Sequence, residues 1–266
     1  MTSIAGNSRD AVRARANTFH ECELLERIVM TPNSSIYRFK IPLDLNLDIP
    51  TGQHVRLAGD VVLPDGSSQR CVRSYTPVTI DHEAHYFELL VKSYPLGKLS
   101  NYISSLKVGQ TIHVCGPQGN FIYRPNMASR IGMIAGGTGI TPMLPILRTV
   151  ACGRAGGRDS TTIDLIFANS TIQDIVFKDE LDEMARTDPN FRVHYVLSTA
   201  PDGWTGGTGY LTSDMITRWL PAPGDGVKIL LCGPPAMVSM VKKTMDSLGY
   251  GKARVVSKPE DQVFVF

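Results

Sequence analysis

A glycine-rich turn between an apolar strand and a helix is the segment of this sequence best suited to bind a phosphate group. The apolar run 133–135 precedes Gly136-Gly137-Thr138-Gly139, and Pro142 suits the first position of the helix that follows. Glycines let a pyrophosphate approach the main chain closely, and a helix N-terminus adds partial positive charge. The spacing is not G-x-G-x-x-G, so a generic dinucleotide-binding dehydrogenase is not implied. A tight structural turn of an α/β domain is the alternative that this segment leaves open.

Two segments in the first half of the chain also combine residues that suit a phosphate. Arg73-Ser74-Tyr75-Thr76 offers a guanidinium for bidentate binding, an aromatic face and short hydroxyl groups. Gly97-Lys98-Leu99-Ser100 opens a helix with a glycine and a hydroxyl group. A tyrosine that packs across a strand pair and ordinary helix capping are the alternatives.

A second strand-to-helix turn lies near the carboxyl end of the chain, at Leu231-Cys232-Gly233-Pro234-Pro235-Ala236-Met237. In an open parallel sheet, ligands bind beyond the carboxyl ends of the strands, so this position predicts that Cys232 lies near the mouth of a site. A buried structural thiol is the alternative reading of a lone cysteine.

The elements that must position these turns change in type along the chain. From Phe19 to about Tyr123, short strands alternate with Gly and Pro-Asp-Gly turns, which predicts an antiparallel β-barrel, or alternatively a sandwich, with one helix inserted over 98–106. After residue 126, apolar strands alternate with helices, which predicts an α/β doubly wound, Rossmann-like parallel sheet. The predicted strand–helix pairs are 131–135 with a helix from 142, 162–168 with 177–186, 191–197 with 213–220, and 227–232 with 235–248. We therefore predict two domains, 18–126 and 127–266, after a flexible lead-in or linker over 1–17.

Composition excludes several classes of protein. The chain has 266 residues, of which 42% are hydrophobic and 20% charged, as in a globular protein with a core. A formal net charge of +2 is too small to indicate nucleic-acid binding. The five cysteines show no C-x-x-C spacing, which favours a reducing compartment, and no metal site is predicted. No transmembrane span and no secretory signal are predicted either.

Together the four segments, in this order and on these elements, resemble the NADH-cytochrome b5 reductases, within the ferredoxin-NADP reductase-like flavoenzymes. The resemblance runs from about residue 19 to 266, and it extends to the reductase module of eukaryotic nitrate reductases and of fused b5/b5-reductase haemoflavoproteins. It implies FAD in the barrel and NADH on the second domain.

The resemblance also implies roles for individual residues. Arg73 would hold the FAD phosphate, Tyr75 would pack against the isoalloxazine ring, and Thr76 would act near flavin N5. Cys232 would act near the nicotinamide, and His54 would lie close to the flavin, although an isolated histidine is as compatible with a structural role. The other positions implied for FAD are Ser74, Leu90, Lys92, Tyr94, Gly97, Lys98, Leu99, Ser100 and Thr141. Those implied for the nicotinamide cofactor are Gly137, Thr138, Gly139, Ala168, Asn169, Ser198, Cys232, Gly233, Pro234 and Met237.

The reaction implied is hydride transfer from nicotinamide C4 to flavin N5, followed by single-electron transfer to cytochrome b5 or a b5-like haem domain. A ferredoxin-type NADP reductase and a nucleotide-sensing module without turnover are the alternatives. Ser198 stands where NADH-selective relatives carry an acidic residue, so we expect NADPH to be tolerated. We expect a monomer, located in the cytoplasm or on the cytoplasmic face of a membrane if an N-terminal anchor exists.

Overall fold

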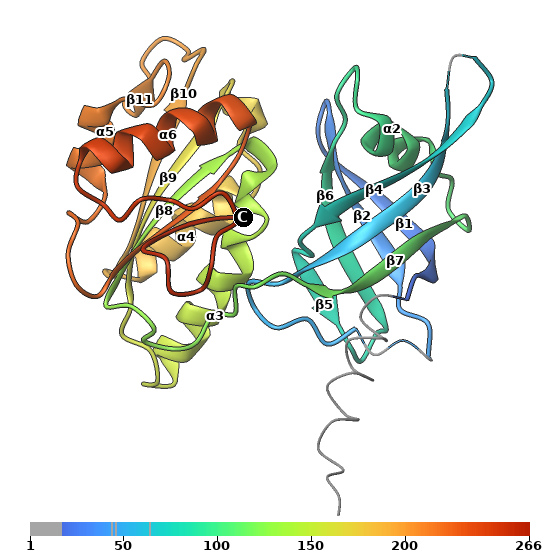
Figure 1. Cartoon of the computed structure of the whole chain (residues 1–266), viewed down its shortest axis with the longest axis horizontal. Helices are drawn as coiled ribbons and strands as arrows, with labels where there is room; N and C mark the ends of the chain where they lie inside the picture. Colours follow the sequence, from blue (N-terminus) through green and yellow to red (C-terminus); the bar gives the residue numbers. More distant parts are fainter. Residues whose placement is uncertain (1–17, 44, 46, 64) are drawn as a thin grey trace, which may run out of the picture. The chain divides into compact units, whose positions relative to one another are not determined.

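The computed structural model describes residues 18–43, 45, 47–63 and 65–266. Its chain divides into two compact units, of which the first ends at Gly119 and the second runs from Asn120 to Phe266 (Figure 1). Each unit has its own sheet, and each is described by itself.

The first unit is an antiparallel sheet of seven strands that curls into a barrel (Figure 1). Its strands are β1 (His20–Thr31), β2 (Ser34–Lys40), β3 (His54–Val62), β4 (Ser68–Tyr75), β5 (Thr79–Asp81), β6 (Tyr86–Lys92) and β7 (Thr111–Gln118), in the order β4-β3-β7-β1-β2-β6-β5. The long strand β1 makes the curvature possible. Its first residues pair with β7, its later residues pair with β2, and irregular register follows Leu24 and Val29.

Helix α2 (Lys98–Ser105) lies against β3, β4 and β6 and covers the barrel core. Leu99 and Ile103, at helical spacing, join the buried side chains of the strands. The helix approaches β3 closely because Gly59 has no side chain: a Cβ there would lie 2.5 Å from the Tyr102 ring. The barrel core therefore fixes where α2 begins, and with it the turn that contains Gly97.

The second unit is a parallel sheet of six strands with the order β11-β10-β9-β8-β12-β13. The strands are β8 (Arg130–Gly136), β9 (Thr162–Asn169), β10 (Phe191–Leu197), β11 (Gly207–Thr208), β12 (Val227–Cys232) and β13 (Val263–Val265). The helices are α3 (Met143–Ala155), α4 (Lys178–Thr187), α5 (Ser213–Trp219) and α6 (Pro235–Ser247), with short 3-10 helices at Gly137–Ile140 and Ile172–Asp174.

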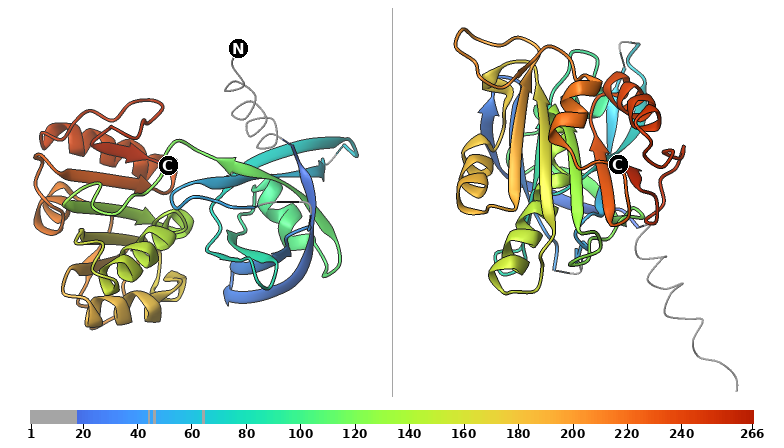
Figure 2. Two further views of the ribbon diagram at one scale, coloured as in Figure 1. Left: turned by 90° about the horizontal axis from the view of Figure 1, so that it is seen from below. Right: turned by 90° about the vertical axis from the view of Figure 1, so that its left-hand side faces the viewer.

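Helices cover both faces of this sheet, as the edge-on view in Figure 2 shows. Buried side chains of β8, β9, β10 and β12 pack with α5 and α6 on one face. Along the chain the strands progress from β8 outward to β11, and β12 then returns to the other side of β8. The strand order therefore reverses between β8 and β12, the place where open α/β sheets bind their ligands.

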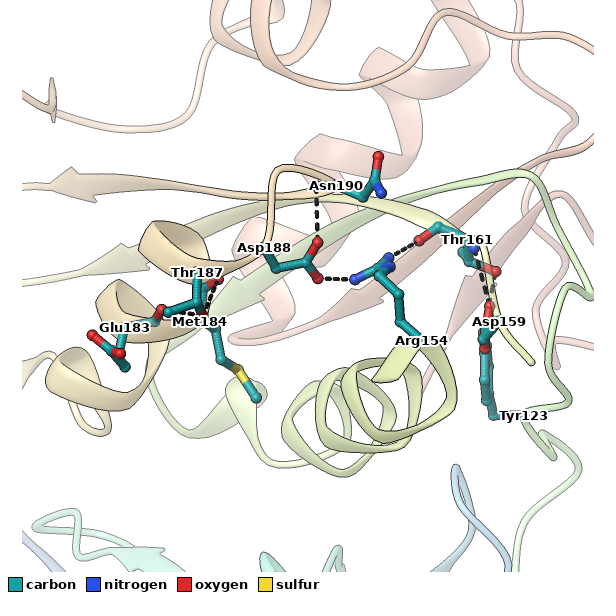
Figure 3. A network of polar contacts seen from close by, with 9 residues as sticks. All are labelled: Tyr123, Arg154, Asp159, Thr161, Glu183, Met184, Thr187, Asp188 and Asn190. Atoms are coloured by element: carbon teal, nitrogen blue, oxygen red, sulfur yellow. Dashed lines mark hydrogen bonds and ion pairs between the residues drawn. The ribbon is translucent and has the colours of Figure 1, made fainter. Parts of the chain in front are cut away.

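The residues directly after Gly119, including Phe121 and Tyr123, pack against the second unit. The Phe121 ring lies 4.9 Å from that of Phe264, and the Tyr123 hydroxyl donates a 2.7 Å hydrogen bond to Asp159. Asp159 also accepts the backbone N–H of Thr161, whose carbonyl accepts from Arg154 (Figure 3). Because of these contacts the structure divides the chain at Gly119, before the position 126/127 at which the change in sequence rhythm places the boundary.

The predicted fold class, an antiparallel barrel followed by a doubly wound parallel sheet, is confirmed. The expectation that a helix begins at Pro142 needs a small correction. Pro142 is the N-cap residue, α3 starts at Met143, and the glycine turn itself forms a 3-10 helix. Among the helices that the structure describes, none is both long and apolar enough to cross a membrane.

Candidate functional site

In the first unit, the end of β4 brings a free cation next to aromatic rings. Side chains alternate along a strand, so Cys71, Arg73 and Tyr75 share one face of β4. Cys71 and Tyr75 contact the barrel core, whereas Arg73 is exposed. In the described part of the chain, the guanidinium donates only to the neighbouring Val72 carbonyl, at 2.7 Å, and pairs with no carboxylate. This leaves most of its donors available to an anion.

The electrostatics of Tyr75 show that its neighbours are close. Burial raises the pKa of the Tyr75 phenol to about 12, the positive charge of Arg73 opposes that rise, and the Tyr94 phenol adds to it. Arg73, Tyr75 and Tyr94, three of the residues that the family resemblance assigns to FAD, are therefore near enough to interact electrostatically. Tyr94 is 49% exposed, which leaves part of its ring free to stack on a ligand.

The start of α2 adds a second group suited to phosphate. Gly97 is its N-cap, and no side chain caps the first turn. A Cβ at Gly97 would lie 2.2 Å from the Ser100 hydroxyl, so a larger residue here would require the Ser100 side chain to rotate away. The Lys98 ammonium donates a 2.8 Å hydrogen bond to Gln69 of β4, which ties the helix start to the strand that carries Arg73.

Of the other residues predicted to bind FAD, some lie near Arg73 and Tyr75 and others do not. His54 lies at the start of β3, and because Val55 pairs with Tyr75, His54 and Thr76 lie at the same end of this strand pair. The His54 ring packs against Gly119, and burial lowers its imidazole pKa. Leu90 is buried on the face of β6 opposite the barrel core, and Lys92 shares that face. The structure of the unit does not bring these two side chains to Arg73.

In the second unit, the glycine turn after β8 packs directly against the turn after β12. A Cβ at Gly139 would lie 2.2 Å from the carbonyl oxygen of Cys232, and one at Gly233 would lie 2.3 Å from the terminal methyl group of Met237. Met237 also covers Gly136, where a Cβ would lie 2.8 Å from its sulfur. The main-chain contact at Gly139 leaves no room for a side chain, and the packing of one turn on the other brings the predicted residues of both turns close together.

Gly137 differs from its neighbours, because its φ of +53° is the left-handed conformation that glycine adopts readily. No heavy atom lies within 4 Å of the position that its Cβ would occupy. This open space beside the main chain is the kind of cradle that a pyrophosphate needs. The Thr141 hydroxyl instead donates a 3.0 Å hydrogen bond to the Thr138 carbonyl and so belongs to the turn itself.

Asn169 provides an independent sign of a ligand. It ends β9, beside Ala168 and next to the end of β8, and the residue is only 9% exposed. Neither its amide nitrogen nor its amide oxygen has a hydrogen-bond partner among the described residues. Because burial of an unpaired amide costs about 1–3 kcal/mol, a bound ligand with a donor and an acceptor would relieve this cost. Ser198 is exposed at the neighbouring strand end, where its N–H donates to the Asn169 carbonyl.

Cys232 is the last residue of β12, and burial raises the pKa of its thiol to about 11. The side chain is therefore an uncharged thiol at neutral pH, a weak hydrogen-bonding group rather than a nucleophilic thiolate. A neutral thiol at this position can act by packing and weak hydrogen bonding, and it is not a nucleophile.

We predict that Cys232→Ser keeps FAD but slows reduction of the flavin by NADH, because the shorter C–O bond and stronger hydrogen bonding of the hydroxyl group displace the ring. Stopped-flow flavin absorbance under anaerobic conditions measures this rate. Cys152→Ser, at an exposed cysteine on α3, is the matched control. Reduction of the Cys232→Ser protein at the wild-type rate would assign Cys232 to a structural role.

One residue of this site was not among the predicted ligands. Gly136 ends β8, and a Cβ there would meet Pro234 as well as Met237, each at 2.8 Å. Its place in the glycine-rich turn was the available signal, but local sequence does not reveal which turn it faces.

Comparison with known proteins covers both units. Residues 21–123 match the family model described as an oxidoreductase FAD-binding domain, and residues 133–243 match that of an oxidoreductase NAD-binding domain. The chain is 55% identical over 249 residues to NADH-cytochrome b5 reductase 1 of Pyricularia oryzae, which covers 93% of this chain and 80% of that protein. It is 51% identical over 267 residues to the protein of the same name in Emericella nidulans, covering 99% and 85% of the two chains.

A solved structure agrees with these relatives. The cytochrome b5 reductase domain of Ulva prolifera nitrate reductase superposes with a TM-score of 0.83 at 30% identity, covering 94% of this chain and 98% of that one.

Proposed function

Because the chain belongs to the NADH-cytochrome b5 reductase family, we propose that it oxidises NADH through bound FAD and passes single electrons to a b-type haem protein such as cytochrome b5. The observation that carries this proposal is the 55% identity with a reductase of that name over 93% of the chain, which includes both cofactor domains. The residues that the two cofactors need are present in each unit.

FAD, when bound, supplies a two-electron acceptor that can release electrons one at a time. The chain supplies placement and charge. Arg73 would bind a phosphate of FAD, the first turn of α2 would offer its N–H groups to the pyrophosphate, and Tyr75 would pack against the ring system. The raised pKa of Tyr75 keeps this side chain a neutral phenol throughout the physiological range.

The second unit binds the nicotinamide dinucleotide at the reversal of strand order. Gly137 would admit the pyrophosphate next to the main chain, and the Asn169 amide would bind polar groups of the cofactor. The uncharged Cys232 thiol at the end of β12 would help to orient the nicotinamide ring.

The electron acceptor is tested by comparing three assays on the purified, FAD-containing protein with NADH as donor. Cytochrome b5 reduction should far exceed that of a [2Fe-2S] ferredoxin, and ferricyanide reduction reports whether the flavin is reduced at all. If ferricyanide is reduced rapidly but ferredoxin is reduced faster than cytochrome b5, the electron acceptor is an iron-sulfur protein and not a b-type haem protein. A protein that carries no flavin and oxidises no NADH would instead favour a nucleotide-sensing module.

We predict that the protein prefers NADH but that Ser198→Asp sharpens this preference. A carboxylate at the end of β10 would accept hydrogen bonds from the ribose 2′-hydroxyl and repel a 2′-phosphate, whereas Ser198 is uncharged. We expect the ratio of kcat/KM for NADH to that for NADPH to rise by about tenfold or more, as for a repulsion of about 1.4 kcal/mol.

Steady-state kinetics with both cofactors measures this ratio. Ser213→Asp, an exposed position at the start of α5, is the matched control for the added charge. An unchanged ratio in Ser198→Asp would show that Ser198 does not face the ribose.

We also propose a reducing location, the cytoplasm or the cytoplasmic face of a membrane. The free state of all five cysteines supports it. Cell fractionation with an antibody against the chain tests it, and recovery from a secretory compartment would contradict it.

A further inference from the structure

A cavity of about 690 Å³ lies at the β10–β11 edge of the second unit, on the side of the sheet order opposite to β12 and β13. Its walls come from β10, from α5 and from the segment Trp204–Thr208. Both tryptophans of the chain, Trp204 and Trp219, line it. The His194 ring stacks on Trp219 with centroids 5.0 Å apart and an interplanar angle of 4°. The volume falls in the range of about 300–1,000 Å³ that is usual for ligand sites.

The hydrogen bonds of β10 show which of its residues direct their backbone N–H and C=O groups away from β9. Two hydrogen bonds at its ends fix the pattern: Ile163 N–H donates to the Asn190 carbonyl, and Ser198 N–H donates to the Asn169 carbonyl. In a parallel ladder, alternate residues bond to the same neighbour. Even-numbered residues of β10 therefore bond to β9, and odd-numbered residues direct their N–H and C=O groups to the other side.

On that other side, pairing is incomplete. Leu197 is satisfied, because its carbonyl accepts from Gly209 N–H and it pairs with β11. In the described structure, however, β11 pairs only with Val196 and Leu197. Val193 thus has an N–H and a C=O that point away from β9 and meet no strand, and Val193 lines the cavity. The cavity borders the part of the β10 edge that a longer β11 would cover.

Charge at the cavity favours an acidic occupant. Arg218 lines it from α5, and the described residues give this guanidinium no ion pair or hydrogen bond. Lys178 lines it from α4 and is paired with Asp182, while Asp214 is the single carboxylate in the wall. A free arginine beside unpaired main-chain groups is suited to a strand that carries a carboxylate.

We propose that this cavity binds an extended acidic segment of a partner protein, which pairs with the main chain of Val193 on the β10 edge and places a carboxylate on Arg218. The tryptophan and histidine rings form the walls against which apolar side chains of the same strand pack. This inference is independent of the proposed electron-transfer reaction, since none of the predicted cofactor residues lines the cavity.

The chain offers a direct readout, because its only two tryptophans line the cavity. The FAD-containing protein is titrated with a capped peptide that alternates valine and glutamate while tryptophan emission is recorded. A saturable change is expected. The same peptide with lysine in place of glutamate should bind at least about tenfold more weakly, as expected for loss of a charge-assisted hydrogen bond. No saturable change at millimolar peptide would overturn the proposal.

Strand addition and charge are tested separately. A valine–glutamate peptide with N-methyl groups on the edge that faces β10 cannot pair with Val193, and this test leaves the protein unaltered.

The protein variants test the same two contacts from the other side. Val193→Pro removes the outward N–H and should weaken peptide binding, while Val193→Ile retains this N–H and should not. Arg218→Gln should weaken binding by at least about tenfold, whereas Lys243→Gln, at an exposed lysine of α6, should not.

All four variants should reduce flavin with NADH at the wild-type rate, which shows that they are folded. Equal binding of the N-methylated peptide would overturn strand addition, and equal binding to Arg218→Gln would overturn the role of the arginine. Concentration-dependent dimerisation in light scattering, lost in Val193→Pro, would make the occupant a second copy of this chain and overturn a separate partner.

Discussion

An Arg73→Ala variant is expected to purify almost without FAD and to lose NADH oxidation, while its two units remain folded. Arg73 is exposed on β4, beside Tyr75, and among the residues that the structure describes it has no carboxylate partner. Removing it therefore disrupts no internal ion pair. It removes the charge-assisted hydrogen bonds to phosphate, each worth about 1.5–3 kcal/mol, so FAD affinity should fall by about 10- to 100-fold or more.

The measurement is the ratio of flavin to protein absorbance after dialysis, followed by titration with FAD. Arg70→Ala is the matched control, because Arg70 is an exposed arginine on the same strand and pairs with Asp60 at 3.1 Å. Arg73→Lys keeps the charge but loses the planar fork, so it should retain FAD only in part. Full flavin content in dialysed Arg73→Ala would show that the FAD phosphate is bound elsewhere.

The second large effect is a contrast between two neighbouring glycines. Gly139→Ala should destabilise the second unit by about 1–3 kcal/mol or more, because its Cβ would lie 2.2 Å from the Cys232 carbonyl and 3.0 Å from the Gly233 Cα. These are main-chain atoms, so the two turns must separate. In Gly137→Ala, by contrast, the new Cβ has no heavy atom within 4 Å. The substitution should therefore destabilise the protein by only the cost of an alanine in the left-handed conformation, about 1–2 kcal/mol.

The two variants should therefore affect different properties, Gly139→Ala the stability of the fold and Gly137→Ala the binding of NADH. Gly139→Ala should lower the thermal midpoint and the rate of flavin reduction together. Gly137→Ala should remain folded but bind NADH more weakly, since its methyl group occupies the open space beside the main chain. Thermal unfolding of the FAD-containing protein and the NADH dependence of flavin reduction distinguish them. A Gly137→Ala protein with unchanged KM for NADH would place the pyrophosphate elsewhere.

Much of the fold could be predicted from the sequence, because the relevant signals are local. Apolar periodicity marks the strands and helices, and the change from closely spaced strands to alternating strands and helices predicts both fold classes. The helix predicted over 98–106 is α2 (Lys98–Ser105), and the strand predicted over 227–232 is β12 with the same bounds. Turn chemistry at Gly97 and Gly137 is local as well, so these residues could be singled out before their surroundings were known.

The sequence also determined what kind of chemistry the chain supports. A guanidinium beside an aromatic ring and glycine turns at strand ends are suited to dinucleotides whatever their final neighbours. Together with the family resemblance, they predicted an FAD- and NADH-dependent oxidoreductase, which the family models and the fungal reductases confirm.

Only the tertiary structure decided which distant segments meet. Strand order places β8 beside β12, and this long-range pairing brings Gly139 against Cys232. The burial of the unpaired Asn169 amide and the unpaired edge at Val193 likewise depend on neighbours far along the chain. Apolar periodicity shows which face of a strand or helix is buried. The neighbours of a strand in the sheet depend on the packing of the whole core, so they cannot be predicted from the local sequence.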